Sequence, residues 1–118
     1  MFEVKITRDF SAAHRVEDYP GNCEKLHGHN WKVEVIVRSP VLDSLGMVVD
    51  FRKLKEITDE VLGPLDHSYL NEAGPLRGLN PTAENLARYI FAEVAKKGPV
   101  HRVNVFETES SVASYFEG

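Results

Sequence analysis

Two stretches of the chain alternate apolar and polar side chains with a period of two. Residues 29–38 do so most cleanly. One face there carries Trp31, Val33, Val35 and Val37, and the other carries Lys32, Glu34 and Arg38. Residues 2–15 begin in the same way, with Phe2, Val4 and Ile6 opposite Lys5 and Thr7. A period of two is typical of a strand with one buried face, so the chain must fold around a sheet that needs cover.

Two amphipathic helices can supply that cover. Asp50 suits an N-cap, and Leu54, Ile57 and Val61 form an apolar stripe that ends at Gly63-Pro64. A second helix is expected to begin near Asn80-Pro81-Thr82, with Asn80 or Thr82 as its cap. Its apolar face comprises Leu86, Ala87, Ile90, Phe91 and Val94, and it ends at residues 96–99.

Further strands are expected at residues 103–107 and 111–117, with a short one at 47–49. The resulting order is strand, strand, helix, helix, strand, strand. We therefore predict an α+β fold in which helices lie on one face of an antiparallel sheet, as a single domain over residues 1–118. The open face and the edges of so small a sheet need cover, which predicts an oligomer.

Composition excludes several function classes. The net charge of −4 argues against a nucleic-acid binder. No apolar stretch approaches the roughly 20 residues that cross a bilayer, so no membrane partner is expected. The single cysteine cannot form an intrachain disulfide, and the first residues do not resemble a signal peptide. A cytoplasmic location follows as an expectation.

Histidines form the strongest chemical pattern. His27 and His29 are two residues apart, so on a strand they share a face, and Gly28 between them can let the backbone bend. If the first two strands form a hairpin, His14 lies beside them. Three neutral histidines suit Zn²⁺ and leave its fourth position open, as in catalytic sites. A chance pair of histidines is the alternative, and His101 is assigned to the surface.

Three other positions admit both a chemical and a structural interpretation. Cys23 can be a small buried apolar residue. Alternatively, it can be a catalytic thiolate, if a nearby cation lowers the pKa of its thiol. Asp66 and His67 form a turn or an acid–base pair. Glu107 shares the parity of Val103 and Val105, so its carboxylate points to the buried face. There it needs a partner, either an arginine or a ligand that offers paired N–H donors.

Taken together, these residues resemble the family of 6-pyruvoyl- and 6-carboxy-tetrahydropterin synthases over nearly the whole chain. The motifs that carry the resemblance are Phe10-Ser11-Ala12-Ala13-His14, Cys23-x3-His27-Gly28-His29, Val49-Asp50-Phe51-x2-Leu54-Lys55, Leu65-Asp66-His67-x2-Leu70-Asn71, Asn80-Pro81-Thr82-x-Glu84-Asn85 and Glu107-Thr108. Each motif alone is weak, but all of them in this order are specific.

The resemblance implies a role for each site residue. His14, His27 and His29 would hold Zn²⁺, and Cys23, Asp66 and His67 would form the catalytic set. Glu107 would anchor the pterin, with Thr108 and Thr82 nearby. The resemblance also implies a tunnelling fold, with a four-stranded antiparallel sheet and two helices on one face. Trimers of such chains close a barrel, commonly stacked as hexamers, with active sites between subunits.

The implied activity is that of a zinc-dependent lyase acting on 7,8-dihydroneopterin triphosphate. The spacing Cys23-x3-His27 resembles the bacterial 6-carboxy-tetrahydropterin synthases of queuosine biosynthesis, which release acetaldehyde. The alternatives are a 6-pyruvoyl-tetrahydropterin synthase and a dihydroneopterin-cleaving variant. Some family members have a glutamate in place of the cysteine, but Cys23 is present here, so we interpret Glu24 as incidental. A non-catalytic zinc-binding or assembly module is an alternative of another class, and it predicts that Cys23→Ala changes nothing.

Overall fold

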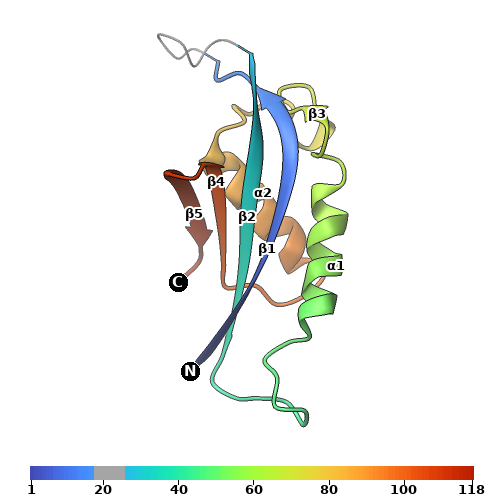
Figure 1. The fold of residues 1–118 in the computed structure, drawn as a ribbon, viewed down its shortest axis with the longest axis vertical. Coiled ribbons are helices and arrows are strands. Elements are labelled where there is room, and N and C mark those ends of the chain that lie inside the picture. The colour runs from blue at the N-terminus through green and yellow to red at the C-terminus, as the bar shows by residue number, and fades with distance from the viewer. Residues whose placement is uncertain (18–25) are drawn as a thin grey trace.

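The computed structural model describes residues 1–17 and 26–118, whose strands form one sheet in the order β3-β1-β2-β4-β5 (Figure 1). The long strands β1 (Phe2–His14) and β2 (His27–Ser39) pair antiparallel along their whole length. β4 (Arg102–Thr108) pairs antiparallel with β2, and β5 (Ser111–Phe116) with β4. These four strands are the antiparallel sheet that the alternation predicts.

Two local features differ from the prediction. Residues 47–49 are not a strand, because Asp43 closes this loop instead: its amide donates to the Met47 carbonyl at 2.9 Å, and its carboxylate accepts from the Met47 amide at 3.0 Å. A fifth strand, β3 (Ser68–Tyr69), pairs parallel with β1 at Ala12 and Ala13. The chain thereby returns to the edge of β1 after the first helix.

Both helices are capped as the sequence predicts. α1 (Phe51–Leu62) begins after Asp50, whose carboxylate accepts from the Arg52 amide at 2.9 Å. α2 (Ala83–Ala95) begins after Thr82, whose hydroxyl accepts from the Asn85 amide at 3.1 Å, so Thr82 rather than Asn80 is the cap. A short 3₁₀ turn, η2 (Gly74–Leu76), lies between the two helices in the chain.

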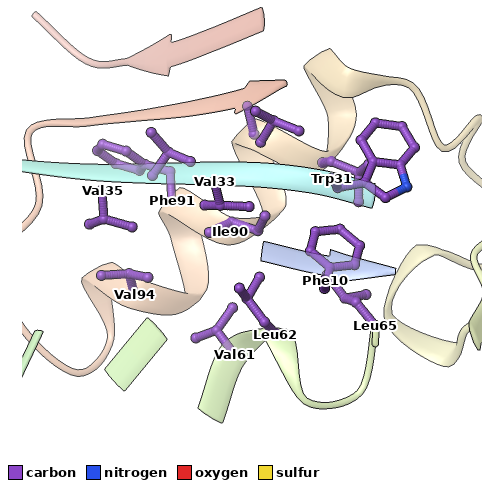
Figure 2. Packing of buried hydrophobic residues seen from close by; sticks show 14 of the residues in the cluster. Phe10, Trp31, Val33, Val35, Val61, Leu62, Leu65, Ile90, Phe91 and Val94 are labelled. Atoms are coloured by element: carbon purple, nitrogen blue, oxygen red, sulfur yellow. The ribbon is translucent and has the colours of Figure 1, made fainter. Parts of the chain in front are cut away.

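The core lies between the helices and one face of the sheet. Figure 2 shows Val33 and Val35 of β2 packed among Ile90, Phe91 and Val94 of α2. Burial of these apolar faces is the main force that holds helices and sheet together. Within the described residues, neither helix has the length and apolar character needed to cross a membrane.

In the part of the chain that the structure describes, no helix lies on the other face of the sheet (Figure 1). A row of polar side chains crosses the centre of this face, with one residue from each of the four antiparallel strands. Glu34 of β2 pairs with Lys5 of β1 at 3.1 Å and accepts from Asn104 of β4 at 3.0 Å, and Asn104 accepts from Ser114 of β5 at 2.6 Å. Burial pushes the pKa of Glu34 upward, but these donors together hold it below its ordinary value.

Candidate metal centre

The pairing of β1 with β2 brings the three predicted histidines together. His14 lies directly opposite His27, and Ala12 lies opposite His29. All three rings point to the face of the sheet that carries the core, just beyond its last apolar layer. Their ring centroids are 4.5, 4.7 and 5.1 Å apart, and the Nε2 atoms of His14 and His27 are 3.0 Å apart.

Glu107 completes this group from β4. One of its carboxylate oxygens lies 3.4 Å from Nε2 of His29, and the other lies 4.0 Å from Nε2 of His14. One ligand atom from each of the four residues lies within 4.8 Å of all the others. The parity argument therefore placed Glu107 correctly, and its partners are histidines rather than an arginine. Its side chain keeps 34% of its surface exposed, so a ligand can reach it.

The nitrogen atoms of the site can serve as ligands of a bound cation. Nδ1 of His14 lies 2.8 Å from the Pro81 carbonyl oxygen, which can only accept, so Nδ1 carries the proton and Nε2 presents a lone pair. Nε2 of His29 is buried and has no hydrogen-bond partner among residues 1–17 and 26–118, since the approach of Glu107 does not form one. A divalent cation would satisfy these lone pairs, so the donor set fits a metal.

The electrostatics of the site favour the metal-binding form of the histidines. Burial lowers the pKa of His14 below its ordinary value, although the Pro81 carbonyl and Glu107 oppose the shift. Burial also lowers the pKa of His29, again against the pull of Glu107. Both rings are therefore neutral near pH 7, and a neutral imidazole is the form that binds metal.

Trp31 forms the floor of the centre. Its ring is fully buried and stacks on that of Phe10, with 6.1 Å between the ring centroids. Its centroid lies 4.9 Å from that of the His14 ring and 5.3 Å from that of the His29 ring. Its indole N–H donates to the Ala12 carbonyl at 3.3 Å. Two of the ligand rings therefore rest on a rigid aromatic layer, which limits the orientations they can adopt.

The predicted acid–base pair lies on the β3 side of β1. Asp66 accepts from the Ser11 amide at 2.9 Å, and this hydrogen bond holds the pKa of its carboxyl below its ordinary value. The same carboxylate lies 3.1 Å from Nδ1 of His67. The His67 side chain is 83% exposed, and its φ of 56° is unusual for a residue other than glycine. Such strained conformations often mark functional positions.

A pocket lies beside His67 on the face of the sheet opposite the three histidine rings, because Ser11, Ala13 and Asn30 alternate with Ala12 and His29 along their strands. It has a volume of about 400 Å³, and it is lined by Ser11, Ala12, Ala13, Gly28, His29, Asn30, His67 and Ser68. Gly28 does not bend the chain as expected, because it lies in the regular pairing of β2 opposite Ala13. Within the described residues, a Cβ atom at Gly28 would approach only the Ala12 carbonyl oxygen, at 4.0 Å, so space beside the glycine is open there.

Glu107 also borders a second pocket, beside the start of α2. This pocket has a volume of about 240 Å³ and is lined by Glu107, Ala83 and Glu84, among others. The Thr82 hydroxyl caps α2, and Thr108 ends β4, where its hydroxyl accepts from the Ser110 amide at 3.3 Å. Cys23 and Glu24 lie outside the described residues.

Comparison with known proteins agrees with this arrangement. A family model described as 6-pyruvoyl tetrahydropterin synthase matches residues 3–118. An Archaeoglobus fulgidus protein provisionally named 6-carboxy-5,6,7,8-tetrahydropterin synthase is 45% identical over 93% of this chain and 91% of its own. The 6-carboxy-5,6,7,8-tetrahydropterin synthase of Synechocystis is 40% identical over 91% and 87%. The structure of Caenorhabditis elegans 6-pyruvoyl tetrahydropterin synthase superposes with a TM-score of 0.90, at 29% identity, over 99% and 96%.

Proposed function

The chain belongs to the 6-pyruvoyl tetrahydropterin synthase family, and from that premise we propose that it is a zinc-dependent 6-carboxy-5,6,7,8-tetrahydropterin synthase. It would convert 7,8-dihydroneopterin triphosphate and water into 6-carboxytetrahydropterin, acetaldehyde and triphosphate. The observation that carries the proposal is the convergence of His14, His27 and His29 beside Glu107. Relatives at 40–45% identity that bear the 6-carboxy name favour this branch of the family.

In this proposal His14, His27 and His29 hold the zinc ion. When bound, Zn²⁺ supplies Lewis acidity that makes the hydroxyl and adjacent C–H groups of a substrate side chain more acidic. Three nitrogen ligands leave a position open for such a substrate, as catalytic zinc sites require. Burial of His14 and His29 supports this role, because it keeps the ligands neutral at the pH of the cell.

Glu107 is the residue we assign to the pterin. A pterin presents neighbouring N–H donors at its guanidine-like edge, and a carboxylate can accept two of them in parallel. The partial exposure of Glu107 and its position in a pocket at the start of α2 support this role. Thr82 and Thr108 are assigned to the same subsite, as residues near the pterin.

Cys23, Asp66 and His67 are the proposed proton-transfer groups. The Cys23 thiolate would take a proton from the substrate, and His67 would return or relay one. The carboxylate of Asp66, 3.1 Å from Nδ1 of His67, would orient that imidazole and stabilise its charged form.

We further propose that the active site is completed between subunits of a homo-oligomer, a trimer or a stacked hexamer. The high exposure of His67 supports this, since a catalytic imidazole works best where a second surface excludes water. A cytoplasmic enzyme of queuosine biosynthesis would accord with the single cysteine, whose thiol must stay reduced.

A 6-pyruvoyl-tetrahydropterin synthase is the second candidate, favoured by the similarity to the Caenorhabditis elegans enzyme. The test is to incubate the zinc-loaded protein with 7,8-dihydroneopterin triphosphate and identify the products by mass. Acetaldehyde together with the 6-carboxy product supports our proposal. A pyruvoyl product without acetaldehyde contradicts it, and cleavage of unphosphorylated dihydroneopterin would identify the aldolase-type variant.

Cys23→Ala separates a catalytic site from a zinc-binding module. We expect this variant to keep its zinc and its fold and to lose turnover by at least about 100-fold, since general acid–base catalysis contributes that much. A variant that turns over at the wild-type rate would show that the thiol is not a catalytic group.

A further inference from the structure

The edge of β1 that faces β3 is paired far beyond the two residues of β3. Ser11 donates its amide to the Asp66 carboxylate at 2.9 Å, and its carbonyl accepts from the His67 amide at 2.6 Å. Two residues on, the Ala13 carbonyl accepts from the Leu70 amide at 2.8 Å. The backbone on both sides of Ala12 is therefore tied to the segment that follows α1.

Beyond Ala13, asparagine side chains take the place of a paired strand. The Asn71 amide group accepts from the Arg15 N–H at 2.8 Å and donates to the Arg15 carbonyl at 2.7 Å. Asn80 does the same two residues later, accepting from the Glu17 N–H at 2.8 Å and donating to its carbonyl at 3.1 Å. A side-chain amide has the donor and acceptor of a peptide group, so each asparagine imitates one strand residue.

His14 lies in the middle of this paired edge and points to the metal centre. Its own Nδ1–H donates to the carbonyl of Pro81, the residue that follows Asn80. The Asn80 carbonyl accepts from the Thr82 amide at 2.9 Å and from the Asn85 side chain at 2.8 Å, which fixes the turn that carries Pro81. Asn80 therefore holds both the backbone beyond His14 and the turn that orients its ring.

We propose that Asn71 and Asn80 are positioning residues for the metal ligand His14, and that metal affinity depends on their clamp on Arg15 and Glu17. The inference rests on the proposed zinc site. Hydrogen-bond partners that hold a metal ligand commonly change metal affinity by 10–100-fold when they are lost. Here the clamp acts on the backbone and on the acceptor of the Nδ1 proton, since the side chains of both asparagines bond backbone groups of Arg15 and Glu17.

The test compares Asn71→Ala and Asn80→Ala with the matched control Asn104→Ala. Asn104 also makes two side-chain hydrogen bonds, but on the open face of the sheet. Zinc affinity is measured with Zn²⁺ and a competing chromophoric chelator, and each fold is checked by circular dichroism. We expect zinc affinity to fall by about 10-fold or more in Asn71→Ala and Asn80→Ala, and to stay within about twofold of wild type in Asn104→Ala.

A second measurement needs no metal. In wild type, the amide protons of Arg15 and Glu17 should exchange with solvent slowly, and Asn71→Ala should speed exchange at Arg15 at least about tenfold. If an alanine variant does not fold, Asn71→Asp and Asn80→Asp replace it, because they keep the acceptor oxygen and exchange the N–H donor for a charged oxygen that the backbone carbonyl repels. Fast exchange at both amides in wild type would overturn the clamp.

The outcomes separate this inference from the proposed function. Wild-type zinc affinity in both clamp variants, or an equal loss in Asn104→Ala, overturns the positioning role and leaves the zinc enzyme standing. A wild-type protein that binds no Zn²⁺ contradicts the zinc enzyme itself, and the inference falls with it. A loss of affinity confined to the clamp variants supports the proposal.

Discussion

At the scale of single residues, the sequence predicted which histidines lie together, but it did not predict the contacts that hold their rings in place. Parity along two strands was enough to place His14, His27 and His29 together, because a hairpin sets which residues face each other. The alternation along β4 also predicted that the Glu107 side chain lies on this face. Nothing local marked the Pro81 carbonyl as the acceptor for His14, since that contact joins residues 67 positions apart. Such contacts depend on how a loop meets a strand.

Zinc binding should stabilise the folded protein. If the site holds Zn²⁺, free zinc at 100 times its Kd should raise the free energy of unfolding by about 2.7 kcal/mol. His29→Ala should abolish this gain, because it removes one of three nitrogen ligands. The control is His101→Ala, which removes a histidine outside the cluster. Chemical denaturation with and without zinc measures the effect, and a gain that survives in His29→Ala would exclude that residue as a ligand.

At the scale of elements, features that a few neighbouring residues determine were predicted well. Alternation located the long strands, and Asp50 and Thr82 marked the helix starts. Elements that exist only through a partner were not. Residues 47–49 have the composition of a strand, yet Asp43 bonds both backbone groups of Met47 and makes the segment part of a loop. Conversely, the two residues of β3 are a strand only because β1 offers them an edge.

The two helix caps allow a matched test of Thr82. Asp50→Ala and Thr82→Ala each remove a side-chain acceptor at a helix start, so each should lower the free energy of unfolding by about 1 kcal/mol. If Thr82 also contacts the pterin, only Thr82→Ala should raise KM for the triphosphate substrate. Denaturation and steady-state kinetics measure the two effects, and an unchanged KM would leave Thr82 with the structural role alone.

Glu34 should make the sheet sensitive to acid. The pKa of Glu34 lies below its ordinary value of 4.5, so the ionised form stabilises the fold above about pH 4.5. This contribution is lost as the pH falls through the lower, folded-state pKa. At pH 7, Glu34→Gln should cost about 1–2 kcal/mol, because it weakens hydrogen bonds to a charged group that is only 12% exposed. Urea denaturation from pH 7 to pH 3 should show the difference closing, and a constant difference would refute this role.

At the scale of the whole molecule, the isolated chain leaves surfaces that call for partners. Among the described residues, the β1 edge is bonded from Ser11 onward by β3 and its neighbouring residues, which leaves the first half of that edge open. β5 is the outer strand on the other side, and no helix of the described residues covers the second face of the sheet. Uncovered strand edges promote uncontrolled pairing, so closed assembly is the expected remedy. Assembly itself was expected from the sequence, but its geometry depends on surfaces that no local pattern describes.

We therefore expect a closed trimer or hexamer in solution. Sedimentation velocity across a hundredfold range of concentration should give one species of three or six chains. The physical reason is that joining β1 of one chain to β5 of the next removes both edges at once. A monomer throughout that range would contradict the assembly and with it the proposal that active sites lie between subunits.

If three histidines hold the metal, the cysteine stays free for catalysis. X-ray absorption spectroscopy on the zinc-loaded protein, with zinc counted per chain, distinguishes this arrangement from one with a sulfur ligand. We expect one zinc per chain and three nitrogen ligands at about 2.0–2.1 Å. A sulfur ligand at about 2.3 Å would place Cys23 on the metal instead, and a protein that retains no zinc would contradict the site altogether.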